Sequence, residues 1–224
     1  MTGTSFIKFG FLLGNAVKNL YRHRKRYILY AVIFLAALTV FFCAVTIHSA
    51  ADAVLDTDLD IYAPGGVWLP VEELDLTGAV YSREQVKAAD EAASLTLRIV
   101  WLTGLAAALL VHYTIRFLCH VRMTEYAVIC SAGAGMHTVL FSAALELLLF
   151  LTGIYTAGIF SGFGSVHLLK ALGKVPGWLS FSLPGWPVCG AGMGCIVLIL
   201  LFRTLALARA FRRTAPIRLL AEHT

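Results

Sequence analysis

Three ionisable side chains lie in or at the edge of long apolar runs, and such positions are the first place to look for chemistry. They are His48, His112 and Glu146. A charge inside a membrane is costly, so an ionisable group there is a candidate for proton transfer or ligand binding. Two carboxylates would be needed for an intramembrane aspartyl-type site, and Glu146 is the one acid in a predicted span. Nothing in the spacing requires the three to converge, so no catalytic residues are predicted.

Glu146 and His112 each have a functional and a structural interpretation. Glu146 begins a long apolar run, where it either serves function or simply pairs with Arg116, Arg122 or another basic residue at the membrane surface. We favour the pairing. His112 is expected to be a packed, neutral imidazole, because a proton relay would need an acidic neighbour. Both are retained as intramembrane polar candidates.

Other catalytic and metal-binding patterns are missing from the sequence. It has no GxxxxGK[ST] loop for nucleotide binding, no HExxH and no GxSxG. The five cysteines form no CxxC pair, so neither a zinc site nor a disulfide framework is indicated. Asp56, Asp58 and Asp60 lack the glycine and glutamate of a calcium loop. We therefore expect a non-catalytic chain with no metal and no cofactor of its own.

The composition indicates the class of protein that positions these residues. The 224 residues are 59% hydrophobic and 14% charged, with a mean hydropathy of +0.79. Soluble domains are nearer 45–50% apolar and roughly 25% charged. The sequence predicts an all-α membrane protein with four transmembrane helices. The predicted segments are an amphipathic cytoplasmic helix at 1–26, spans at 27–49, 95–118, 137–165 and 185–207, a small acidic outer region at 50–94, a cytoplasmic helix and turn at 119–136, an outer loop at 166–184 and a basic tail at 208–224.

The distribution of charge sets the expected orientation. Basic residues gather before the first span, between the second and third, and after the fourth, whereas residues 50–94 hold ten acidic and two basic residues. Basic segments stay on the cytoplasmic side, so both termini are expected there. The basic first segment is expected to contact anionic lipid and not nucleic acid, because a span follows it at once.

Residues 50–94 are expected to contain short strands and one helix start. Residues 60–62 and 67–69 alternate in the manner of strands. Ser82 with Gln85 three positions later has the pattern of a capping box, so a helix is expected to begin at Arg83 and to run into the second span. About 45 residues are too few for a robust independent core.

The segment between spans two and three is predicted to be a short surface helix followed by a turn. Arg122 and Glu125 are three apart and share one helical face. Gly133 and Gly135 then permit a sharp turn before the third span. This pattern has two equally good interpretations: a short helix that binds a partner protein, or a loop at the membrane surface that connects two spans.

The same segment resembles the FtsX/MacB-like, or type VII, permeases of ABC transporters. Their segment between spans two and three reads basic-x-x-Glu, then apolar and small residues, then Gly-Ala, followed by a helix with an early glutamate. Asn19-Leu20-Tyr21-Arg22 and the tail from Pro216 to Leu220 resemble the family's start and end. The residues that match in the middle segment are Arg122, Glu125, Ala127, Val128, Ile129, Gly133, Ala134 and Glu146; Cys130, Gly135 and Met136 depart from the pattern.

The resemblance implies a permease subunit in a bacterial cell membrane. A separate cytoplasmic ABC ATPase would bind ATP and Mg²⁺ and grip the segment between spans two and three, and a second permease chain would complete a homodimer or heterodimer. We expect export or extraction of an amphiphile such as a peptide, antibiotic or lipid. The residues expected to couple to the ATPase are Arg122, Glu125, Tyr126, Val128, Ile129, Gly133 and Gly135.

Two alternatives stay open, along with the role of four glycines. A membrane subunit of this kind can transmit force to an envelope enzyme or sensor without moving a substrate. A four-helix scaffold or channel outside the ABC class would need neither the short helix nor the tail. Gly158 with Gly162, and Gly190 with Gly194, form GxxxG pairs that favour close helix packing within or between subunits.

Overall fold

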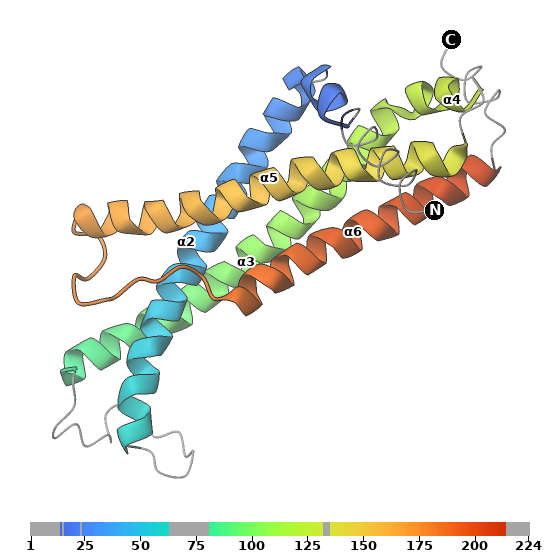
Figure 1. Ribbon diagram of the computed structural model, residues 1–224. Helices are drawn as coiled ribbons and strands as arrows, with labels where there is room; N and C mark the ends of the chain where they lie inside the picture. The colour runs from blue at the N-terminus through green and yellow to red at the C-terminus, as the bar shows by residue number, and fades with distance from the viewer. Residues whose placement is uncertain (1–13, 15, 23, 63–80, 132–134, 214–224) are drawn as a thin grey trace, which may run out of the picture. The chain divides into compact units, whose positions relative to one another are not determined.

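The computed structural model describes residues 14, 16–22, 24–62, 81–131 and 135–213. Residues 16–22 are helical. The helices that follow are α2 (Arg24–Tyr62), α3 (Arg83–Val121), α4 (Met123–Ser131), α5 (Met136–Ala171) and α6 (Trp186–Arg213) (Figure 1). No strand occurs among these described residues, so the predicted all-α fold is confirmed.

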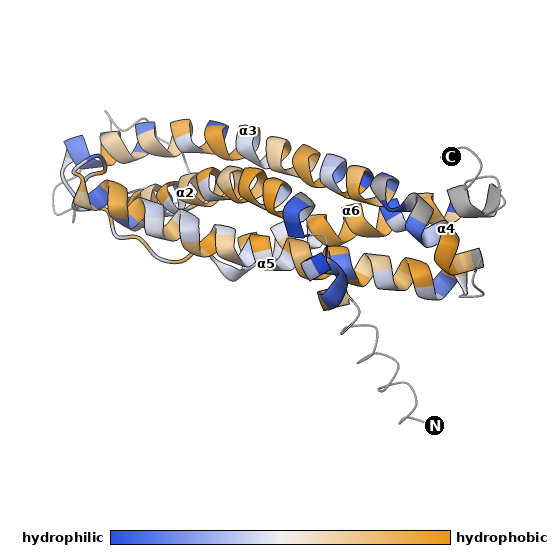
Figure 2. Cartoon of the chain, turned by 90° about the horizontal axis from the view of Figure 1, so that it is seen from above, coloured by the Kyte–Doolittle hydropathy of each residue, from blue (hydrophilic) through white to orange (hydrophobic). Residues whose placement is uncertain are grey.

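Four of the helices are long and apolar enough to cross a membrane. The segments that qualify are Tyr27–Asp56, Glu84–His120, Met136–Ala171 and Trp186–Arg209. A span needs about 20 apolar residues because an α-helix rises 1.5 Å per residue and the hydrocarbon core is roughly 30 Å thick. Hydrophobic residues cover much of the length of these helices (Figure 2). The number of spans agrees with the sequence prediction.

The region 50–94 differs from the prediction. α2 continues to Tyr62, well beyond the predicted end of the first span, whereas α3 begins at Arg83 as predicted. Residues 60–62 are helical, and the strand predicted there is wrong. The alternation of polar and apolar residues at 60–62 was too short to outweigh the extension of an established helix, which gains one hydrogen bond for each residue added. Residues 67–69 lie outside the described part of the chain.

The predicted start of α3 is confirmed in detail. The backbone N–H of Ser82 donates to Oε1 of Gln85 at 2.9 Å, and the backbone N–H of Gln85 donates to Oγ of Ser82 at 3.3 Å. This reciprocal pair satisfies donors that the first turn of a helix otherwise leaves without partners. The capping box fixes where α3 begins.

The third span is longer than expected and ends at a glycine. α5 continues to Ala171, so the outer loop predicted from residue 166 begins after that residue. Gly173 has φ 67°, its N–H donates to Lys170 O at 3.0 Å, and the N–H of Lys174 donates to Leu169 O at 2.9 Å. These two bonds form a Schellman motif, which requires the left-handed conformation that glycine adopts without strain.

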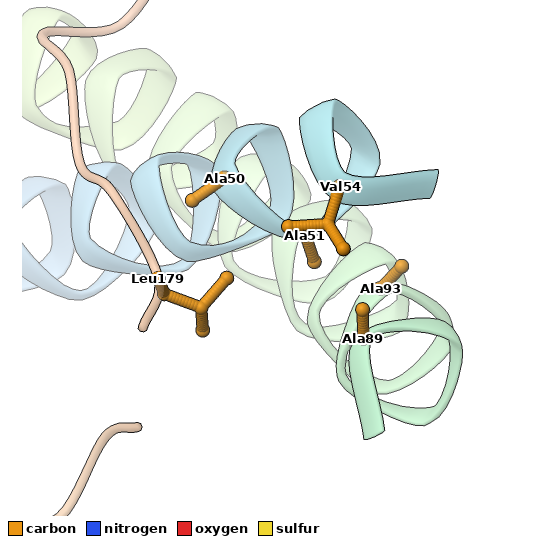
Figure 3. Close-up of a cluster of buried hydrophobic side chains, with 6 residues drawn as sticks. All are labelled: Ala50, Ala51, Val54, Ala89, Ala93 and Leu179. Carbon is orange, nitrogen blue, oxygen red and sulfur yellow. The ribbon is translucent and has the colours of Figure 1, made fainter. Parts of the chain in front are cut away.

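The chain divides into two compact units. One contains residues 1–35, 107–156 and 189–224, and the other contains residues 36–106 and 157–188. The second unit has a small apolar core made by α2, α3 and the connection after α5 (Figure 3). Its buried members are Ala50, Ala51, Val54, Ala89, Ala93 and Leu179. Alanines let the backbones of α2 and α3 approach closely, and Leu179 packs against them.

The first predicted GxxxG pair packs within the chain. A Cβ on Gly158 would lie 2.6 Å from Leu38 Cβ, and one on Gly162 would lie 2.5 Å from Phe42 Cβ. The two glycines therefore let α5 contact α2 more closely than a side chain would allow. Beside them, Thr39 Oγ1 donates to Ser161 Oγ at 3.0 Å.

The second GxxxG pair has no such contact within the described part of the chain. A Cβ on Gly190 or Gly194 would meet nothing within 4 Å. Gly192, which lies between them, packs instead against Tyr155 of α5, whose hydroxyl donates to the Cys189 carbonyl oxygen at 2.9 Å. The GxxxG pattern therefore found the closely packed glycines on α5 and missed the one on α6.

Candidate functional site

The short helix α4 follows α3 through a bend at Arg122. α3 ends at Val121 and α4 begins at Met123. The backbone bonds continue across the bend, because the Arg122 N–H donates to Leu118 O at 3.3 Å and the Tyr126 N–H donates to Arg122 O at 3.0 Å. Arg122 thus lies at the junction of the two helices.

Arg122 forms a buried ion pair with Glu146 of α5. The Nη1 atom of Arg122 lies 2.5 Å from Oε2 of Glu146, and the two side chains are 6% and 1% exposed. The hydroxyl of Tyr27 donates to the other carboxylate oxygen, Oε1, at 2.7 Å. Both oxygens of Glu146 therefore have a donor, as a buried carboxylate requires. Of the basic residues considered as partners for Glu146, Arg122 is the one that pairs with it.

The same guanidinium also holds Glu125 on α4. Its Nε atom lies 2.9 Å from Oε2 of Glu125, whose side chain is 40% exposed. The ring of Tyr126 lies under the guanidinium, with its centroid 5.1 Å from Arg122 Cζ. Arg122 thereby connects a fully buried acid on α5 with a half-exposed acid on α4. We call Tyr27, Arg122, Glu125, Tyr126 and Glu146 the Arg122 network.

The protonation states within this network follow from its geometry. Burial opposes the charge of Arg122, but Tyr126, Glu146 and Glu125 outweigh it and hold the pKa of the guanidinium above its ordinary value. Burial raises the pKa of the Tyr126 phenol, and the nearby Arg122 only partly offsets this. Both shifts favour a cationic Arg122 and a neutral Tyr126 at neutral pH.

The remaining coupling candidates lie on the exposed side of α4. Val128 and Ile129 are 52% and 44% exposed, and they lie three and four residues after Glu125, on the same helical face. Gly135 is exposed just before α5, and its carbonyl accepts from the N–H of Thr138 at 2.9 Å. Gly133 lies outside the described residues. The predicted set therefore separates into buried members, Arg122 and Tyr126, and an exposed group that a partner can reach.

His112 has a partner that the sequence analysis did not identify. Arg203 of α6 donates to the imidazole of His112, with Nη2 3.2 Å from Nδ1 and a closer approach to Nε2. A ring nitrogen that accepts a hydrogen bond is unprotonated, so His112 is a neutral, packed imidazole here. The signal for Arg203 was available, because it is a lone basic residue in the apolar run of span four.

His48 has an acidic neighbour on its own helix. His48 lies 3.3 Å from Asp52 on the same helix, in the other unit from His112 and Glu146. Across the part of the chain that the structure describes, no group of three or more His, Cys, Asp or Glu side chains gathers in the manner of a metal site.

These features define a multi-pass, all-helical membrane protein with a short helix between its second and third spans. Residues 98–215, more than half of the chain, match the family described as the FtsX-like permease C-terminal domain. The chain belongs to this family and is a membrane subunit of the ABC-transporter class, whose members usually work with a cytoplasmic ABC ATPase. Comparisons with curated proteins and with solved structures gave no significant match.

Proposed function

We propose that this chain is the permease subunit of an ABC transporter that uses ATP hydrolysis on a separate ATPase to export or extract an amphiphile. In this proposal α4 is the coupling helix. The ATPase binds its exposed residues Glu125, Val128 and Ile129, and movement of α4 on ATP binding is passed to the spans. ATP and Mg²⁺ are bound by the ATPase, and a second permease chain completes the assembly.

The observation that carries this proposal is the position of Arg122. One guanidinium contacts Glu125 on α4 and Glu146 on α5, and Glu146 in turn accepts from Tyr27 of α2. A partner that displaces α4 therefore acts through Arg122 on two membrane helices at once.

The strength of the connection follows from burial. Removing one member of a buried ion pair leaves an uncompensated charge and costs roughly 3–5 kcal/mol. Because Arg122 and Glu146 are almost fully buried, their separation is resisted by a cost of this order. A solvent-exposed ion pair contributes only about 0–1 kcal/mol to stability, so it would break before it transmitted movement from one helix to another. α4, α5 and the start of α2 are thus expected to move together.

Co-purification of the ATPase from native membranes tests the docking step. The full-length chain should retain an ABC ATPase, and Glu125→Arg or Val128→Asp should release it. Glu91→Arg is the matched control, because Glu91 is an exposed acid on α3 outside the segment that contains α4. If no ATPase accompanies the wild-type chain under any nucleotide condition, a scaffold or channel replaces the permease assignment.

The coupling step has a separate readout. The double variant Arg122→Gln/Glu146→Gln leaves the exposed face of α4 in place, so the ATPase should still bind. Its rate of ATP hydrolysis should no longer respond to the permease. Reconstitution in vesicles then separates the two branches of function, because an exporter moves a labelled amphiphile with ATP. A complex that hydrolyses ATP and moves none supports the force-transmitting alternative.

A further inference from the structure

A cluster of basic side chains lies on α3 and α6, and it forms no ion pair with an acid among the residues that the structure describes. Arg203 contacts His112, and Arg116 follows His112 by four residues on the same side of α3. Arg203 Nε is buried and makes no hydrogen bond with any described residue. Arg116 is exposed and forms no ion pair within the described ranges. The cluster carries two permanent positive charges and one unsatisfied buried donor, which together favour an anion.

The cluster lies near one end of its spans. The span on α6 begins at Trp186, and Arg203 lies about 25 Å further along the helix axis. This distance is close to the thickness of the hydrocarbon core, which is roughly 30 Å. Arg116 lies four residues before His120, the last residue of the span on α3. This is the depth of lipid headgroups, where long basic side chains extend to the interface.

An apolar groove lies on the neighbouring side of α3. It has a volume of about 260 Å³ and is open to the surroundings along α2 and α3. Tyr113 connects the two features, because it lines the groove and its ring lies against His112, with centroids 5.7 Å apart. Tyr30 and Phe117 form one wall, with centroids 5.2 Å apart. Its lining residues include Tyr30, Ile33, Phe34, Leu110, Tyr113 and Phe117.

We propose that His112, Arg116 and Arg203 bind the phosphate of an anionic phospholipid whose acyl chain occupies the groove between α2 and α3. Charge selects the occupant. A zwitterionic lipid carries its own cation next to the phosphate, which the two arginines repel, whereas an anionic headgroup has none. The adjoining apolar groove selects a lipid over a free phosphate, which has no chain to place there. The site is separate from α4, so it does not depend on the proposed coupling to an ATPase.

Native mass spectrometry of the full-length chain in detergent tests this proposal, with phosphatidylglycerol and phosphatidylcholine of identical acyl chains as probes. The wild-type chain should bind phosphatidylglycerol more tightly. Arg116→Ala should weaken that binding about fivefold, the contribution of one basic residue near a membrane surface, and should leave phosphatidylcholine unchanged. Arg98→Ala is the control, because Arg98 is an exposed arginine of the same helix that lies 18 residues before Arg116.

A second substitution tests whether the groove contributes to lipid binding. Ile33→Trp fills it and should weaken the binding of both lipids, whereas Leu102→Trp, at an exposed position of α3 that does not line the groove, should have no effect. Equal binding of the two lipids by the wild type would overturn the proposal, as would equal losses in Arg98→Ala and Arg116→Ala. Displacement of phosphatidylglycerol by inorganic phosphate alone would also overturn it, because the groove would then contribute nothing.

Discussion

Glu146 keeps its charge inside an apolar helix because two donors meet it there, one from Arg122 and one from Tyr27. Sequence alone identified the acid and proposed a basic partner for it, since a lone carboxylate in a span needs one. It did not identify Tyr27, which is distant in the chain and belongs to another helix. Side chains of this kind become visible only when the packing of helices is known.

At this scale the first prediction concerns the carboxylate. Glu146→Gln leaves Arg122 buried with Glu125 as its one remaining carboxylate, so we expect the free energy of unfolding to fall by about 3 kcal/mol. Thermal denaturation in detergent measures this as a lower Tm. Adding Arg122→Gln should recover part of the loss, because no buried charge then remains. A double variant no more stable than Glu146→Gln alone would contradict this reasoning.

The second prediction isolates the tyrosine. Tyr27→Phe removes the donor 2.7 Å from Glu146 and retains the ring, which packs edge-on against Phe150. A hydrogen bond to a charged group contributes roughly 1.5–3 kcal/mol, so a fall of about 2 kcal/mol is expected. Tyr30→Phe on the same helix is the control, because its ring contact with Phe117 survives the change. Equal stability of the two variants would mean that the hydroxyl of Tyr27 contributes nothing.

At the scale of elements, the packing of α5 against α2 depends on Gly162. A Cβ there would lie 3.0 Å from the Cys43 backbone nitrogen as well as close to Phe42, and neither helix can yield without moving its backbone. We expect Gly162→Ala to lower the Tm, at a cost of roughly 1–3 kcal/mol. Gly164→Ala is the matched control, since nothing lies within 4 Å of its Cβ position. That variant should be neutral or gain up to about 1 kcal/mol in helix propensity.

The start of α3 gives a local prediction. Ser82→Ala removes the side-chain acceptor of the capping box, which costs about 1 kcal/mol. Hydrogen exchange should therefore quicken over the first turn of α3 and stay unchanged near Val111, in its last third. Ser94→Ala, within the same helix, should show no such change. Faster exchange along the whole of α3 would show that the cap supports more than its own turn.

The sequence predicted the long elements better than their ends. Apolar length located all four spans, and Ser82 with Gln85 located the start of α3, because both signals are local. The extension of α5 to Ala171 was missed, although Gly173, two residues later, is a recognisable signal for the end of a helix. The strand prediction at 60–62 was wrong, because alternation over three residues is a weak signal when a long helix, α2, directly precedes them. The partner of His112 depended on which helices are neighbours, which no local pattern states.

At the scale of the whole molecule, an even number of spans predicts that both termini lie on one side of the membrane. A cysteine introduced at Thr224 should therefore react with a membrane-impermeant reagent from the same side as one at Thr2, and one at Asp75 from the opposite side. The basic residues near both ends of the chain predict that the side on which the termini lie is the cytoplasmic side. The native cysteines would be replaced first. Labelling of Asp75→Cys and Thr224→Cys from the same side would require an even number of spans between them instead of three, and would contradict the fold.

The pairing of Arg203 with His112 has a consequence for biosynthesis. Insertion of an arginine costs about 3 kcal/mol at the centre of a membrane helix and less near the interface, where Arg203 lies. A nascent chain emerges from its N-terminus, so α3 is made before α6, and the acceptor for Arg203 precedes it. The same order holds for Glu146, whose donors Tyr27 and Arg122 both precede it. Each of these two charged side chains thus enters the bilayer after the residues that pair with it. Insertion in chain order therefore does not leave either charge waiting for a partner that has still to be synthesised.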